Sequence, residues 1–161
     1  MNKIMEEGKI ILNYRLARTG ELPEEDKRLK NAAVEAAKDA YAPYSHFCVG
    51  AAVLLENGTI VKGNNQENAA YPSGLCAERV ALFSAGASFP AVPVVALAIT
   101  AIKDGKIQPS ISPCGACRQV ILEAEQRYGR PLRTLLCGSD ETIIISSAKD
   151  LLPLCFGKSS L

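Results

Sequence analysis

Residues 92–128 read VPVVALAITAIKDGKIQPSISPCGACRQVILEAEQRY, and the fold class follows from this stretch. Its first part, residues 92–102, is almost continuously apolar, which is typical of a strand buried on both faces of a sheet. Residues 115–128 then form a segment that predicts a helix, which ends at Gly129. A buried strand followed by a helix indicates an α/β domain.

The segments on either side extend this pattern. Asn57-Gly58 stands between two strand-like runs and predicts a hairpin. Residues 9–18 are interpreted as a short strand rather than a helical turn, because KIILNY favours a strand. The predicted helices cover residues 24–41, 77–87, 115–128 and 147–152, and the other predicted strands cover residues 46–55, 59–64, 92–102, 132–137 and 142–146. We therefore expect a three-layer α-β-α sandwich with a mixed sheet of about five strands.

Composition limits the classes of function. The chain has 161 residues, enough for about one domain, with 48% hydrophobic and 22% charged residues. A net charge of +1 sets up no field that would hold a nucleic-acid backbone. The longest apolar run, residues 94–102, falls well short of the roughly 20 residues of a membrane span. Acids at Glu6 and Glu7 are the reverse of a signal peptide. We expect a soluble, cytoplasmic protein that binds neither nucleic acid nor membrane.

Three cysteines at the openings of two predicted helices carry the candidate chemistry. Cys76 opens one helix, and Cys114 and Cys117 open the next. Three such ligands suit a tetrahedral Zn²⁺ with one open position, and a helix N-terminus favours thiolate over thiol. Glu78 can lie beside the open position and act on a water there. Arg79 can offset the negative charge of three thiolates by hydrogen-bonding to ligand sulfurs.

Other interpretations of these residues remain open at this point. Cys114 and Cys117 alone could be a redox dithiol or part of a structural zinc site, although a redox pair needs no third cysteine. A structural site would need a fourth ligand, and the remaining cysteines, in apolar settings, are predicted core residues: Cys48, Cys137 and Cys155. Without a partner, Glu78 would be a solvated helix residue and Arg79 a surface charge. His46, the single histidine, is interpreted as a surface residue.

A zinc ligand, Glu two residues later, and a Pro-Cys-x-x-Cys run form the signature of zinc-dependent deaminases. The chain resembles the cytidine deaminase family that acts on free nucleosides, and the resemblance extends from about residue 26 to residue 156. The runs that carry it are Tyr41-Ala42-Pro43-Tyr44-Ser45-His46-Phe47, Val49-Gly50-Ala51-Ala52, Gly63-Asn64-Asn65-Gln66-Glu67-Asn68-Ala69-Ala70-Tyr71, Cys76-Ala77-Glu78-Arg79, Ser112-Pro113-Cys114-Gly115-Ala116-Cys117-Arg118-Gln119 and Leu151-Leu152-Pro153.

The resemblance implies a role for each matching position. Cys76, Cys114 and Cys117 would hold zinc, and Glu78 would be the proton shuttle. The implied substrate contacts are Asn65 and Glu67 on the ribose hydroxyls with Gln66 between them, Phe47 on the pyrimidine, the backbone N–H of Ala77 on the base carbonyl, and Phe156 reaching into a neighbouring subunit's pocket. Taken from the residues alone, Phe47 would be core and Glu67 a loop charge.

The resemblance also implies an activity: hydrolytic deamination of cytidine and 2′-deoxycytidine in pyrimidine salvage, by a homotetramer whose partner is the nucleoside. Residues 23–161 would be the single zinc-dependent deaminase domain, and residues 1–22 an extension with no assigned role. Two positions depart from the family pattern, Gln66 where an aliphatic residue is usual and Cys155 where Ala is usual. Deaminases of a nucleoside antibiotic share the cysteine motifs, whereas Phe47 and the Asn-x-Glu-Asn-Ala run favour the ribonucleoside.

Overall fold

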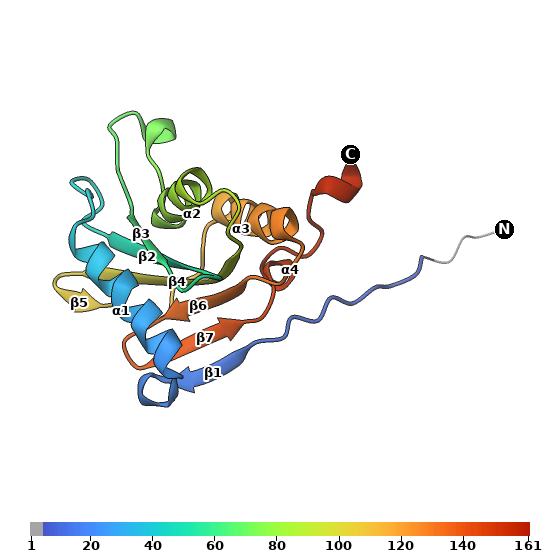
Figure 1. The fold of residues 1–161 in the computed structure, drawn as a ribbon, viewed down its shortest axis with the longest axis horizontal. Coiled ribbons are helices and arrows are strands. Elements are labelled where there is room, and N and C mark those ends of the chain that lie inside the picture. The colour runs from blue at the N-terminus through green and yellow to red at the C-terminus, as the bar shows by residue number, and fades with distance from the viewer. Residues whose placement is uncertain (1–4) are drawn as a thin grey trace.

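The computed structural model describes residues 5–161 and contains one sheet with helices on both faces (Figure 1). The strands are β1 (Arg15–Arg18), β2 (Cys48–Leu55), β3 (Ile60–Asn64), β4 (Val94–Lys103), β5 (Lys106–Ile107), β6 (Arg133–Cys137) and β7 (Glu141–Ile145). The α-helices are α1 (Glu24–Lys38), α2 (Ala77–Ser88), α3 (Gly115–Tyr128) and α4 (Ala148–Leu151). Helix α1 covers one face, and α2 and α3 lie side by side on the other. The predicted three-layer sandwich is confirmed.

The predicted count of about five strands is wrong, because the sheet has seven. Strand β5 has only two residues, too few for a periodicity to reveal. The strand predicted at residues 9–18 is confirmed only for β1, which pairs antiparallel with β7 from Arg15 to Arg18. Its partner strand ends at Ile145, and residues 5–14 have no regular secondary structure.

The sheet order is β1-β7-β6-β4-β2-β3, with β5 paired to β4. Strands β4 and β6 run parallel, and the other neighbours are antiparallel, so the sheet is mixed as predicted. The predicted hairpin joins β2 to β3, with Gly58 at φ 84° and the Leu55 amide donating to the Thr59 carbonyl at 2.9 Å. A positive φ at this turn position favours glycine.

Two glycines bring helices unusually close to opposite faces of the sheet. A Cβ on Gly50 of β2 would lie 2.0 Å from the Ala33 carbonyl oxygen of α1. A Cβ on Gly63 of β3 would lie 2.4 Å from the Ala81 nitrogen of α2. Only glycine permits such backbone contact. The second contact places the start of α2 directly above the end of β3, which is where the candidate site lies.

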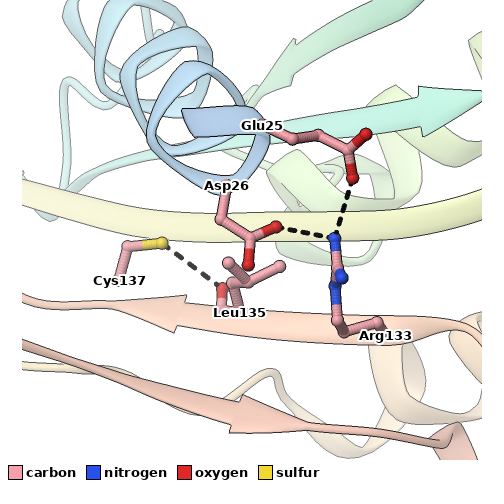
Figure 2. Close-up of polar contacts among 5 residues, drawn as sticks. All are labelled: Glu25, Asp26, Arg133, Leu135 and Cys137. Atoms are coloured by element: carbon pink, nitrogen blue, oxygen red, sulfur yellow. Dashed lines mark hydrogen bonds and ion pairs between the residues drawn. The ribbon is translucent and has the colours of Figure 1, made fainter. Parts of the chain in front are cut away.

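A buried ion pair fastens α1 to the sheet on the face away from α2 and α3. Figure 2 shows Asp26, in the first turn of α1, and Arg133 of β6 pointing toward each other, with Glu25 reaching the same guanidinium. The Asp26 carboxylate is 2.6 Å from Arg133 Nη2, and that of Glu25 is 3.1 Å away. The Cys137 thiol beside them contacts the Leu135 carbonyl, and burial raises its pKa to about 11. Cys137 is therefore the core residue that the sequence predicts.

Across residues 5–161, none of the helices combines the length and apolar character needed to cross a membrane.

Candidate metal centre and active site

Helices α2 and α3 bring the three predicted zinc ligands together. Cys76 is the N-cap residue of α2, Cys114 is the N-cap residue of α3, and Cys117 lies one turn into α3. Their three sulfurs all lie within 4.8 Å of one another, and the sulfurs of Cys76 and Cys114 are 3.9 Å apart. The cluster therefore forms from two helix N-termini that are 38 residues apart in sequence.

The geometry of this cluster fits zinc. Tetrahedral Zn–S bonds of about 2.3 Å place two sulfurs roughly 3.8 Å apart, close to the spacing between Cys76 and Cys114. In the described part of the chain, no His, Asp, Glu or further Cys completes a fourth corner of the cluster. Three protein ligands with an open fourth position are typical of catalytic rather than structural zinc.

Arg79 supplies positive charge to the cluster. Its Nη2 lies 3.7 Å from the Cys76 sulfur, one helical turn along α2. The pKa of Cys76 is lowered to about 5, chiefly by a hydrogen bond with Cys117 and further by Arg79 and Cys114. The same hydrogen bond, together with burial, raises the pKa of Cys117. Within the cluster, the thiolate form is thus favoured at Cys76 and disfavoured at Cys117, and a bound cation would favour the ionised form of its ligands.

Glu78 lies in the first turn of α2 and is only 4% exposed. Burial raises its pKa, and the neighbouring Cys76 thiolate raises it further. Among residues 5–161 it makes no ion pair. The interpretation of Glu78 as a solvated helix residue is therefore wrong, since a solvated carboxylate would be exposed. A buried carboxylic acid that lacks an ion-pair partner and lies beside three convergent cysteines is suited to proton transfer.

A cavity of about 450 Å³ opens beside the cluster, large enough for a small-molecule ligand. It is lined by Cys76 and Arg79 and by three further residues predicted to bind substrate, Asn65, Gln66 and Glu67. The loop that carries these three is fixed by backbone hydrogen bonds between Gln66 and Leu75 at 2.9 and 3.0 Å. The structure therefore brings the cysteine cluster and part of the predicted substrate site to one cavity.

Two of these cavity residues already have partners within the chain. The Glu67 carboxylate accepts from the Tyr44 amide at 2.9 Å and from the amide and hydroxyl of Ser45, which lowers its pKa. The Asn65 side chain accepts from the Val49 amide at 2.8 Å and donates to the Phe47 carbonyl at 3.0 Å. Both side chains hold the cavity wall in shape, and Glu67 stays ionised.

The other predicted contacts lie outside the cavity lining. Phe47 is half-buried, and the Ala77 side chain is buried while its amide starts α2. Phe156 is 61% exposed, and its carbonyl accepts from Gln119 on α3 at 3.0 Å. His46 is exposed, as predicted.

The cysteines outside the cluster differ from one another in exposure. Cys48 is half-buried and Cys137 is buried. Cys155 is exposed, so its predicted core position is wrong. Its apolar neighbours misled the prediction: Leu154 is 94% exposed in the same segment.

Two aromatic residues of the cavity received no role from the sequence. Tyr44 and Tyr71 both line it, with ring centroids 6.3 Å apart in an edge-to-face arrangement. Both belong to runs that carry the family resemblance. Sequence alone does not distinguish an aromatic residue that faces a cavity from one that packs in the core, as the half-buried Phe47 illustrates.

Three thiols at two helix N-termini, with a buried carboxylate and an open cavity near them, form a candidate zinc centre on an α/β sandwich. Comparison with known proteins agrees: the family described as "Cytidine and deoxycytidylate deaminase zinc-binding region" matches residues 23–128. The chain belongs to this family, and zinc is its cofactor.

Individual relatives cover most of the chain. A cytidine deaminase of Sporosarcina psychrophila is 44% identical over 127 residues, which are 79% of this chain and 88% of the relative. A cytidine deaminase of Mycobacterium tuberculosis (strain CDC 1551 / Oshkosh) is 40% identical over 139 residues, 83% of this chain and 90% of the relative. The crystal structure of cytidine deaminase from Burkholderia pseudomallei superposes with a TM-score of 0.70 at 41% identity, covering 81% of this chain and 98% of that one.

Proposed function

We propose that the chain catalyses hydrolytic deamination of cytidine and 2′-deoxycytidine to uridine and 2′-deoxyuridine, with release of ammonia. The observation that carries this proposal is the buried Glu78 beside three convergent thiols, one of which, Cys76, lines a cavity together with Glu67 and Asn65. A redox dithiol would need neither the third cysteine nor the carboxylate.

Glu78 moves the protons of the reaction. A bound zinc would be held by Cys76, Cys114 and Cys117 and would supply a Lewis acid that lowers the pKa of water from 15.7 to about 7. Glu78 takes a proton from the attacking water and passes it to ring N3 as the C4–O bond forms. It then carries the proton of the hydroxyl added at C4 to the departing amine, so that the C4–N bond breaks, the C4 carbonyl forms and ammonia leaves. Its raised pKa suits a group that must both accept and release protons during the reaction.

The substrate contacts follow from the family resemblance and from the cavity. Glu67, held ionised by its Ser45 and Tyr44 contacts, accepts from the ribose hydroxyls together with Asn65, and Gln66 lies between them. Phe47 packs on the pyrimidine ring. The Ala77 amide, one of the free donors at the start of α2, binds the base carbonyl. Arg79 balances the charge of the thiolates.

The wider setting of the reaction is part of the same proposal. Residues 23–161 form the deaminase domain, which works as a homotetramer in the cytoplasm on free nucleosides rather than on nucleic acid. The exposed Phe156 reaches a neighbouring subunit's cavity. The near-neutral composition supports this setting, because it gives no reason for a polyanionic partner.

A single assay tests the proposal: loss of cytidine absorbance together with ammonia release, on protein whose zinc content is measured. We expect turnover of cytidine and deoxycytidine, and very little with free cytosine, because the sugar helps to orient the ring. Glu67→Gln should weaken turnover at unchanged zinc content. Glu35→Gln, an exposed change on α1, is the control and should be neutral. Preference for a nucleoside antibiotic would indicate the related deaminase, and zinc binding without ammonia release would contradict the proposal.

A further inference from the structure

Residues 5–16, which lead into the edge strand β1, carry a row of exposed apolar side chains. Within residues 5–161, strand β1 is an edge strand that pairs with β7 alone. Figure 1 shows the segment before β1 leading away from the helices and strands. Its exposed apolar side chains are Met5 (93%), Ile10 (59%), Ile11 (77%), Leu12 (45%), Tyr14 (55%) and Leu16 (57%). An edge strand that continues into an exposed apolar segment is a template for pairing with another chain.

In an extended conformation, successive side chains of this segment point alternately to two opposite faces. Ile10, Leu12, Tyr14 and Leu16 fall on one face of an extended strand. Three of them already line an apolar groove of about 330 Å³ together with Ile143, Ile145 and Leu151. The apolar face of the segment is thus continuous with a groove of the folded body.

The other face carries charges that are complementary to themselves when two copies run antiparallel. It contains Glu7, Lys9, Ile11, Asn13 and Arg15 in order. With Ile11 of one copy opposite Ile11 of the second, Glu7 of each lies opposite Arg15 of the other. The same register sets Ile10 opposite Leu12 on the apolar face. A register shifted by one residue, centred on Leu12, places Lys9 opposite Arg15 and is disfavoured by like charges.

We propose that residues 5–16 of two copies pair as antiparallel strands about a twofold axis at Ile11. This register lays residues 5–7 of each copy along the free edge of the other's β1, so the two sheets become continuous. A two-stranded ribbon alone is marginal in water, whereas one that extends two sheets is supported by both. The joint is isologous, so it pairs each copy with one other copy, in addition to whatever contacts the deaminase domain itself makes. It is independent of the proposed catalytic activity.

Particle mass by light scattering and sedimentation, on zinc-loaded full-length protein, tests the proposal. We expect Ile11→Asp to lower the mass, because it sets two carboxylates against each other on the axis. The change is at an exposed position, so the melting temperature verifies that the domain stays folded. Turnover per chain should be unchanged, which separates failure of this joint from failure of the proposed function.

Charge exchange tests the register. Glu7→Lys alone and Arg15→Glu alone should each weaken the association on the order of tenfold, and the double variant should restore it. Glu6→Lys is the matched control, because Glu6 lies opposite Leu16 and should leave the mass unchanged. Equal masses for Ile11→Asp and the unmodified protein would overturn the proposal. Failure of the double variant to restore association, or an equal effect of Glu6→Lys and Glu7→Lys, would also overturn it.

Discussion

Two buried carboxylates, on opposite faces of the sheet, face different surroundings. Asp26 and Glu78 each lie in the first turn of a helix and are 3% and 4% exposed, and burial raises the pKa of both. Asp26 has the Arg133 guanidinium 2.6 Å away, which opposes that rise. Glu78 has no ion pair among residues 5–161, and its neighbour is a thiolate.

The difference shows that a raised pKa does not by itself mark a catalytic acid. The two carboxylates differ in their neighbouring groups and in whether those groups line a cavity. Asp26 joins a helix to a strand beneath it, whereas Glu78 adjoins the cysteine cluster, of which Cys76 lines the cavity. We therefore assign a role in stability to Asp26 and a role in catalysis to Glu78. Each assignment can be tested separately.

The largest effect is expected for Glu78→Gln, which keeps the size of the side chain and removes the base. Cytidine turnover should fall by at least the roughly 10²–10⁴-fold usually assigned to general acid–base catalysis. Zinc content should persist, and the melting temperature should hold or rise, because an ionised carboxylate that is costly to bury is gone. Glu123→Gln, an exposed change on α3, is the control. Normal turnover together with lowered stability would show that Glu78 has a structural role instead of a catalytic one.

Arg133→Met should produce the opposite pattern at the other carboxylate. It leaves Asp26 buried without its cation, and we expect a loss of about 1–3 kcal/mol, less than for a fully buried pair because Arg133 is one-third exposed. Turnover per folded molecule should stay normal. Arg28→Met, exposed on α1, is the control.

The pH dependence of this loss follows from the raised pKa of Asp26. The loss should be larger at neutral pH than in acid, because it shrinks as the pH falls through the raised pKa of Asp26 and the charge of this carboxylate disappears. Urea unfolding at neutral and mildly acidic pH measures this change. A loss that grew toward acid would contradict the assignment.

An exposed carboxylate extends the comparison and gives the smallest effect. The Ser45 hydroxyl and the Tyr44 amide lower the pKa of Glu67, so its contribution to stability is present above its unfolded pKa and disappears as the pH falls through its folded pKa. Ser45→Ala should lower the melting temperature by only about 2 °C or less at neutral pH. This difference should shrink in acid to the part that does not depend on pH, the lost bond from the Phe47 amide to the Ser45 hydroxyl. Ser88→Ala is the control, and a difference of the same size in acid and at neutral pH would refute the assignment.

Motifs predicted the metal cluster well because its ligands depend on helix starts. Pro113 and the polar openings of α2 and α3 mark those starts locally, so Cys76, Cys114 and Cys117 follow from short-range signals. The burial of Glu78 and the cavity beside the cysteine cluster depend on how α2 packs on β3, which only the fold specifies.

Long-range pairing explains what the sequence did not predict. Strand β1 forms because it pairs with β7, which lies more than 120 residues later in the sequence. This pairing stops at Arg15. The ion pair between Asp26 and Arg133 joins residues 107 positions apart. Cys155 stands in an apolar run, and its exposure depends on where the segment after α4 lies against the body.

Zinc content across the six cysteine variants tests the central claim most directly, namely that three thiols from two helix N-termini hold the catalytic metal. The unmodified protein should contain about one zinc per chain. Cys76→Ala, Cys114→Ala and Cys117→Ala should each lose it, and Cys48→Ala, Cys137→Ala and Cys155→Ala should each retain it. Loss of zinc in a folded variant of the second set, or its retention in any variant of the first, would contradict the account.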